Sequence, residues 1–213
     1  MRANEFLTEG RNHPVICVDV QPEYSGMNDG AESSVFPEII EFVALKQTGP
    51  VLMFVNAEDQ GLTGDTVAGV KQYWEDTVRE LTGDEENEHP INWSRFQIVD
   101  KGYGYFRGYM DSDVEPRLII MLIRYMYQKK VTDARELVFP PFGQRTNEES
   151  ELKHLIEEFD GESFSIDWTS VAQLKRFNGA YIVGGGRNEC LREVELLMNA
   201  FNIRYRRIDS LVY

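Results

Sequence analysis

The chain has 213 residues and a formal net charge of −14, with 22 Lys plus Arg against 36 Asp plus Glu. Because no basic face of any size balances these acidic groups, we expect no nucleic-acid partner. The length and a hydrophobic content of 42% predict a single domain over residues 1–213. The two cysteines, Cys17 and Cys190, are too few for a disulfide scaffold and indicate a reducing compartment.

The N-terminal residues lack the charged start, the apolar stretch and the small-residue cleavage site of a signal peptide. The longest apolar run, LIIMLI at 118–123, is far shorter than the roughly 18 residues that a membrane-spanning helix needs. We therefore expect a cytoplasmic protein with no membrane partner.

Short apolar runs are the predicted strands, in chain order VICVDV (15–20), VLMFVN (51–56), FQIVD (96–100), AYIVG (180–184) and IRYRRI (203–208). Most of them are nearly continuous, which is typical of strands that helices cover on both faces. Apolar residues at helical spacing lie between the strands, at 36–43 and again at 190–201. The order predicts an α/β fold with a doubly wound, mostly parallel sheet in three layers. Ligands bind such sheets beyond the carboxyl ends of the strands.

Two stretches interrupt this alternation. The acidic segment 83–92 is rich in helix breakers and is predicted to be a solvated loop. Residues 105–178 contain an apolar helix candidate at 113–130, a proline-containing turn and an acidic helix candidate, and we interpret them as a helical insertion before the strand that leads to Cys190. Since LIIMLI would cover every face of a helix, we expect this helix to be buried under the insertion or in a homo-oligomer contact.

Cys190 follows the strand at 180–184 and a glycine-rich turn, at the predicted start of a helix. Unpaired backbone N–H groups and the helix dipole favour an anion there and lower the pKa of a thiol, so Cys190 is a candidate nucleophile. The alternative is a small apolar residue on a buried helix face. Glycines 184–186 are also compatible with a phosphate cradle, but the lysine and the chain position of the nucleotide-binding fingerprints are missing.

Two further polar residues end predicted strands. Asp19, followed by Gln21, comes at the end of the first strand, and Lys101 follows the third. Taken singly, Asp19 is equally suited to capping a loop, and Lys101 to a solvated surface position. Together with Cys190 they would converge at one edge of the sheet. Asp19 could then accept the thiol proton, Lys101 could hold the pair electrostatically, and Cys190 could attack a carbonyl.

These motifs resemble those of the isochorismatase-like cysteine hydrolase superfamily, whose members include nicotinamidases and N-carbamoyl amidases. The family's Asp-x-Gln after a strand is similar to VDVQPEY, its lysine in an aromatic-rich loop to DKGYGYF, and its glycine before the cysteine to VGGGRNECL. Its next strand, which ends in aspartate, is similar to RRIDS at Asp209. The resemblance implies a triad of Asp19, Lys101 and Cys190, a thioester intermediate, and an oxyanion site of backbone N–H groups from Cys190 and the loop before it.

The presence of Cys190 favours the amidase branch over the isochorismatases proper, so we expect hydrolysis of a small amide or ureide. The metal cluster of the family's nicotinamidases is not matched in VNAEDQGLTGD, and we predict no metal and no cofactor. The substrate-binding candidates on the loops after the strands are Tyr24, Asn56, Tyr103 and Phe106, although each is equally suited to loop packing. The rival hypotheses are a catalytically idle fold that serves in binding or assembly and a nucleotide-binding protein.

Overall fold

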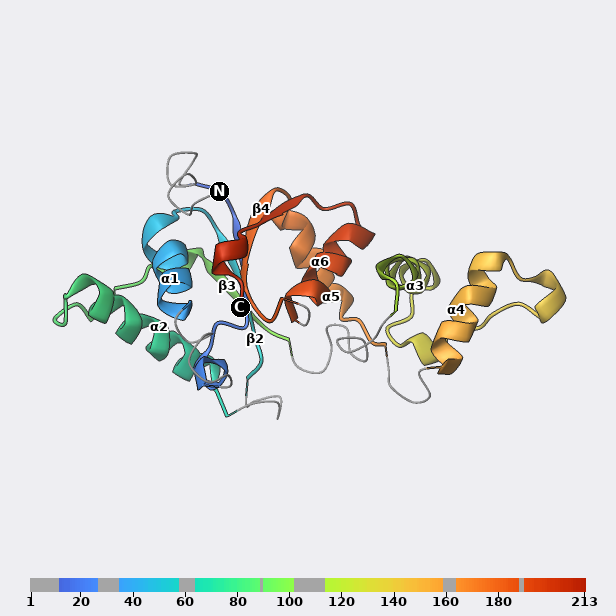
Figure 1. The fold of residues 1–213 in the computed structure, drawn as a ribbon, viewed down its shortest axis with the longest axis horizontal. Helices are drawn as coiled ribbons and strands as arrows, with labels where there is room; N and C mark the ends of the chain where they lie inside the picture. The colour runs from blue at the N-terminus through green and yellow to red at the C-terminus, as the bar shows by residue number, and fades with distance from the viewer. Residues whose placement is uncertain are drawn as a thin grey trace.

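The computed structural model describes residues 12–26, 35–57, 64–88, 90–101, 114–158, 164–187 and 190–213. Its strands are β1 (Val15–Val18), β2 (Val51–Val55), β3 (Phe96–Asp100), β4 (Ala180–Gly184) and β5 (Tyr205–Arg207). They form one sheet in the order β3-β2-β1-β4-β5, with every neighbouring pair parallel (Figure 1). Each strand lies within a predicted run, so the prediction of an α/β fold with a parallel sheet is confirmed.

The direction of winding reverses beside β1. The chain moves from β1 outward through β2 to β3, and then returns to the other side of β1 for β4 and β5. Val18 of β1 is level with Phe54 of β2 and with Gly184 of β4, and Val55 of β2 is level with Asp100 of β3. The residues that follow these four strands therefore emerge at one edge, at a topological switch point where open α/β sheets bind their ligands.

Helices cover both faces of the sheet, as the continuous apolar strands predicted. One face packs against α1 (Phe36–Ile40), its π-helical continuation η3 (Glu41–Lys46) and α2 (Val67–Thr82). The other packs against α5 (Trp168–Leu174) and α6 (Cys190–Ala200), and beyond α6 lie α3 (Pro116–Lys129) and then α4 (Asn147–Glu158). Alternate residues of β1 and β2 point into the two cores, Ile16 and Leu52 into one, Val15 and Val51 into the other.

The described residues between β3 and β4 contain α3, α4 and α5. Helix α3 packs on α6 and carries α4 on its other side, away from the sheet (Figure 1). Ile119, Leu122 and Ile123 are fully buried, and the other residues of LIIMLI are half-buried. Burial of one face of this helix is thus confirmed, while cover for its half-buried residues by an oligomer contact stays a prediction. None of the helices in the described ranges is long and apolar enough to cross a membrane.

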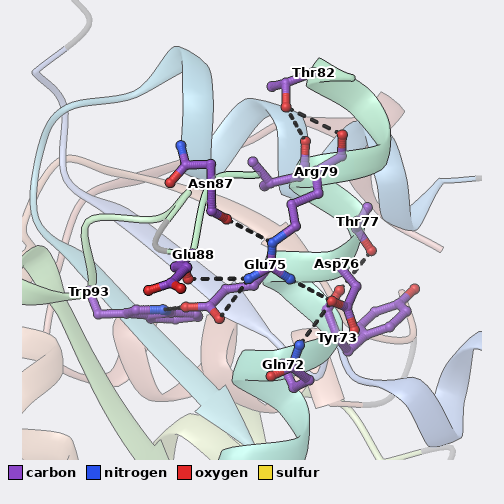
Figure 2. Close-up of polar contacts among 11 residues, drawn as sticks. Gln72, Tyr73, Glu75, Asp76, Thr77, Arg79, Thr82, Asn87, Glu88 and Trp93 are labelled. Atoms are coloured by element: carbon purple, nitrogen blue, oxygen red, sulfur yellow. Dashed lines mark hydrogen bonds and ion pairs between the residues drawn. The ribbon is translucent and has the colours of Figure 1, made fainter. Parts of the chain in front are cut away.

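Helix α2 begins and ends with clear caps. The Thr66 hydroxyl accepts a hydrogen bond from the Gly69 N–H at 2.9 Å, and Gly83 stops the helix with a left-handed φ of 68°. The exposed segment after Gly83 is a loop, as predicted. Arg79 ties it back to the helix by donating to the Asn87 and Glu88 carbonyls at 2.9 and 3.2 Å (Figure 2).

Candidate active site

Asp19 and Lys101 meet at the carboxyl edge of the sheet as a buried ion pair. Asp19 follows β1 and is 1% exposed, and Lys101 follows β3 and is 6% exposed. The Lys101 N–H donates to the Val55 carbonyl at 2.7 Å, which extends the ladder to β2 by one residue. Its Nζ reaches across the end of β2 and donates to Asp19 Oδ2. The convergence that parallel strand ends predicted for these two residues is therefore present.

The backbone of Asp19 has a left-handed φ of 52°, which is uncommon for a residue other than glycine. Such a conformation costs about 1–3 kcal/mol and persists only where its surroundings enforce it. Here the Asp19 N–H donates to the Phe54 carbonyl at 2.9 Å, and the Asp19 carbonyl accepts from the Tyr213 hydroxyl at 2.8 Å. The second carboxylate oxygen, Oδ1, is buried without a hydrogen-bond partner of ordinary geometry within the described ranges. It is the oxygen available for a proton.

Cys190 opens α6 and is partly buried, with its thiol under the influence of both charges of the ion pair. Burial raises the pKa of Cys190 above its ordinary value, the negative charge of Asp19 raises it further, and the positive charge of Lys101 lowers it. Hydrogen bonding with Asp19 also holds the proton on sulfur. The sequence-based expectation of a lowered thiol pKa is therefore wrong, because burial and Asp19 outweigh Lys101. At neutral pH the thiol is protonated.

Lys101 remains charged although it is buried. Burial alone lowers the pKa of Lys101, but the neighbouring Asp19, Cys190 and Glu193 raise it above its ordinary value. Glu193 lies on the first turn of α6, is 5% exposed, and also raises the pKa of Cys190. Sequence reasoning missed this residue, although its spacing of three from Cys190 on a helix places both on one face. The site thus contains two carboxyl groups, one ammonium and one neutral thiol.

The glycine-rich turn joins the ends of β4 and β1. Gly184 has a φ of 86°, and a Cβ there would lie 2.3 Å from the Val18 carbonyl oxygen. The Gly185 N–H donates to the same carbonyl at 2.6 Å. Glycine is needed here for close approach of two backbones, which accounts for these residues without a phosphate.

Two backbone N–H groups of the loop before Cys190 already donate hydrogen bonds within the protein. The N–H of Gly185 is held by Val18, and the N–H of Arg187 donates to the Tyr213 carbonyl at 2.8 Å. These two groups are therefore already engaged. The next two residues, 188 and 189, lie outside the described ranges, and the Cys190 N–H stays a predicted donor.

Tyr24 and Asn56 lie together at the same edge. The side-chain amide of Asn56 donates to the Tyr24 hydroxyl at 2.9 Å, while Gln21 pairs with the Asn56 backbone through two hydrogen bonds of 2.7 and 2.9 Å. Asp65, which sequence reasoning missed, accepts from Gln21 Nε2 at 3.1 Å. Burial and the charge of Asp19 raise the pKa of Tyr24, so its phenol is close to the ion pair. The other two substrate-binding candidates, Tyr103 and Phe106, lie outside the described residues.

Asp209, the last match in the family resemblance, begins a short helical turn after β5 instead of ending the strand. Its carboxylate accepts from Arg207 at 2.7 Å, and its carbonyl accepts from the Arg187 side chain at 3.3 Å. Asp209 therefore contacts the loop before Cys190 through the Arg187 side chain.

Comparison with protein-family models, curated proteins and solved structures found no match to this chain. Among the residues that the structure describes, no group of three His, Cys, Asp or Glu side chains is arranged to hold a metal ion. The chemistry of the site therefore has to be argued from Asp19, Lys101, Cys190 and their neighbours.

Proposed function

We propose that this protein is a cysteine hydrolase of the isochorismatase-like kind that cleaves a small amide or ureide. The observation that carries the proposal is the meeting of three chemically complementary groups from three strand ends. A buried Asp19–Lys101 pair adjoins the Cys190 thiol at the switch point of a parallel sheet. Burying an ion pair costs several kcal/mol in desolvation, so its position beside a thiol favours a chemical role.

The first half of the reaction begins from the neutral thiol. As sulfur attacks the substrate carbonyl carbon, the thiol proton passes to the Asp19 carboxylate, and the C–S bond forms while the carbonyl oxygen takes up the negative charge. Collapse of this intermediate breaks the C–N bond, and the leaving amine takes the proton back from Asp19. The products of this half are a free amine or ammonia and an acyl thioester on Cys190.

In the second half, water attacks the thioester carbonyl and Asp19 accepts the water proton. Collapse breaks the C–S bond, releases the acid and returns the proton to sulfur, which restores the starting state. Lys101 stays an ammonium throughout, since its pKa is raised by its anionic neighbours. Its constant charge lowers the cost of negative charge on sulfur and on the substrate oxygen, which is electrostatic stabilisation in a site with little water.

In this proposal the helices between β3 and β4 are an insertion relative to the family, and Tyr24 and Asn56 form part of the substrate wall. Their phenol and amide groups offer hydrogen bonds beside the half-buried ring of Tyr24, which suits a small planar amide. The protein would act in the cytoplasm without metal or cofactor, as a homo-oligomer.

The proposal is tested with purified protein and a panel of small probes, namely primary amides, N-carbamoyl amino acids and the activated ester p-nitrophenyl acetate. We expect Cys190→Ala to abolish turnover of every probe that the wild type hydrolyses. Cys17→Ala is the matched control, because Cys17 is the other cysteine, lies in β1 and is 0% exposed. Wild-type turnover in Cys190→Ala would overturn the proposal and favour the idle fold that serves in binding or assembly.

A further inference from the structure

Tyr213 connects the two loops that carry the base and the nucleophile. Its hydroxyl donates to the Asp19 carbonyl at 2.8 Å, and its own carbonyl accepts from the Arg187 N–H at 2.8 Å in the loop before Cys190. Its ring packs against Phe36 of α1, with centroids 4.9 Å apart. One residue therefore spans the switch point between β1 and β4.

The hydroxyl acts where the backbone is under strain. Asp19 has its left-handed φ of 52° directly after β1, and the carbonyl that Tyr213 holds belongs to that same residue. Without this hydrogen bond, less would oppose relaxation of Asp19 towards ordinary backbone angles, and its carboxylate would turn with it. Burial raises the pKa of Tyr213, and the charge of Asp19 raises it further, so the hydroxyl stays a donor over the working pH range.

We propose that Tyr213 is a positioning residue whose hydroxyl holds the strained backbone of Asp19, and so keeps the carboxylate against Lys101 and Cys190. As a role in hydrolysis, the inference rests on the proposed function. That the Tyr213 hydroxyl holds Asp19 beside the Cys190 thiol is a statement about geometry, and it does not depend on hydrolysis.

The thiol itself reports on this geometry. The groups that interact electrostatically with Cys190 are Asp19 after β1, Tyr24 before α1, Lys101 after β3, Glu193 on α6, and Tyr213. Among the charged groups, Asp19 has the largest effect and raises the pKa of Cys190. If Asp19 turns away, the thiol pKa falls and iodoacetamide alkylates Cys190 faster at a fixed pH.

The experiment compares Tyr213→Phe with the wild type by iodoacetamide alkylation of Cys190 from pH 6 to 9 and by p-nitrophenyl acetate turnover. We expect alkylation to be about three- to tenfold faster at each pH, because the thiolate fraction below the pKa rises about tenfold for each unit by which the pKa falls, while the thiolate becomes less nucleophilic. Turnover should change in the opposite sense and fall by about ten- to a hundredfold, since a displaced base serves the reaction poorly. Tyr205→Phe is the matched control, because its hydroxyl accepts a hydrogen bond from the Asn199 amide at 3.3 Å and lies on β5, away from the ion pair.

A second comparison places Tyr213→Phe in the Asp19→Asn background. If Tyr213 acts through the Asp19 carboxylate, it should not change the alkylation rate further there. Cys17 remains unlabelled in every variant that is folded, because it is fully buried. Unchanged alkylation in Tyr213→Phe, or the same acceleration with and without the Asp19 carboxylate, would overturn the inference. Faster alkylation in a protein that hydrolyses no probe would support the geometry and overturn the proposed function.

Discussion

Two polar networks of this protein differ in burial and in how far apart their members lie in the chain. Lys101 and Asp19 have side chains that are 3% and 1% exposed and are 82 positions apart. Arg79 is 20% exposed and pairs with Asp76, three positions away on α2, and with the loop that follows (Figure 2). The first network can form only after three strands have assembled, whereas the second forms with its own helix.

The difference indicates different purposes. The Arg79 network satisfies carbonyls of the loop after α2, and its neighbour Glu75 accepts from the Trp93 indole at 2.7 Å, so it fastens a local connection. The Asp19–Lys101 pair links the ends of β1 and β3, which the strand ladder already connects through β2. Burial of the pair costs desolvation energy. A network of this second kind is expected where charge is needed for chemistry.

The largest expected effect is on the buried pair. Lys101→Met should lower the free energy of unfolding by about 3–5 kcal/mol, because it leaves a buried carboxylate without its partner. The double variant Lys101→Met with Asp19→Asn should recover a large part of this loss, since Asn is neutral and tolerates a left-handed backbone. Denaturant unfolding measures both.

The pH dependence of that loss has a definite sign. Since the folded-state pKa of Lys101 is raised, its contribution is complete below the unfolded pKa of about 10.4 and is lost only at higher pH. The stability difference between wild type and the neutral double variant should therefore be constant from about pH 6 to 9. A difference that shrinks as the pH rises across this range would mean that Lys101 does not remain charged.

A smaller effect is expected on the thiol. Asp19→Asn removes the charge that raises the pKa of Cys190 and leaves Lys101 to lower it, so alkylation at pH 7 should be about tenfold faster or more. Turnover of p-nitrophenyl acetate should fall in the same variant, because the proton acceptor is gone. Asp65→Asn makes the same substitution at the same edge, and no change in alkylation is expected there. Slower alkylation in Asp19→Asn would show that Asp19 activates the resting thiol.

The smallest effect belongs to the exposed network. Arg79→Gln should cost about 1 kcal/mol, since a partly exposed charge with several acceptors is worth more than an isolated surface pair. Arg135→Gln is the control, because Arg135 is 60% exposed and pairs locally with Asp133, and we expect no measurable change in stability there. Thermal unfolding of both variants measures the difference. If Arg79→Gln lowered the free energy of unfolding as much as Lys101→Met does, the two networks would not differ in their effect on stability.

The sequence predicted the sheet and the meeting of Asp19 with Lys101 for a simple reason. Strands that are apolar on both sides must be covered by helices, and the residues that follow parallel strands share one edge. The helix candidate at 113–130 contains α3, although only alternate parts of LIIMLI are fully buried. Helix α5 was not predicted individually, since its seven residues give too short a pattern.

What the sequence did not predict depends on distances in the folded chain. The pKa of Cys190 is raised because of burial and of Asp19, and neither can be judged from the position of a cysteine before a helix. Tyr213 is 194 positions from Asp19, so no local pattern connects them. The sequence left a phosphate cradle open as a weak alternative for the triple glycine, and the register of β1 against β4 accounts for Gly184 and Gly185.

The most direct test of the central claim is to trap the acyl group on Cys190. Wild type and Asp19→Asn are mixed with p-nitrophenyl acetate, quenched in acid and analysed by peptide mass spectrometry. The account predicts one acetyl group on the Cys190 peptide and none on the Cys17 peptide, with more of the adduct surviving in Asp19→Asn, because hydrolysis of the thioester needs the carboxylate. An acetyl group on other residues only, or release of p-nitrophenolate at the wild-type rate from Cys190→Ala, would contradict it.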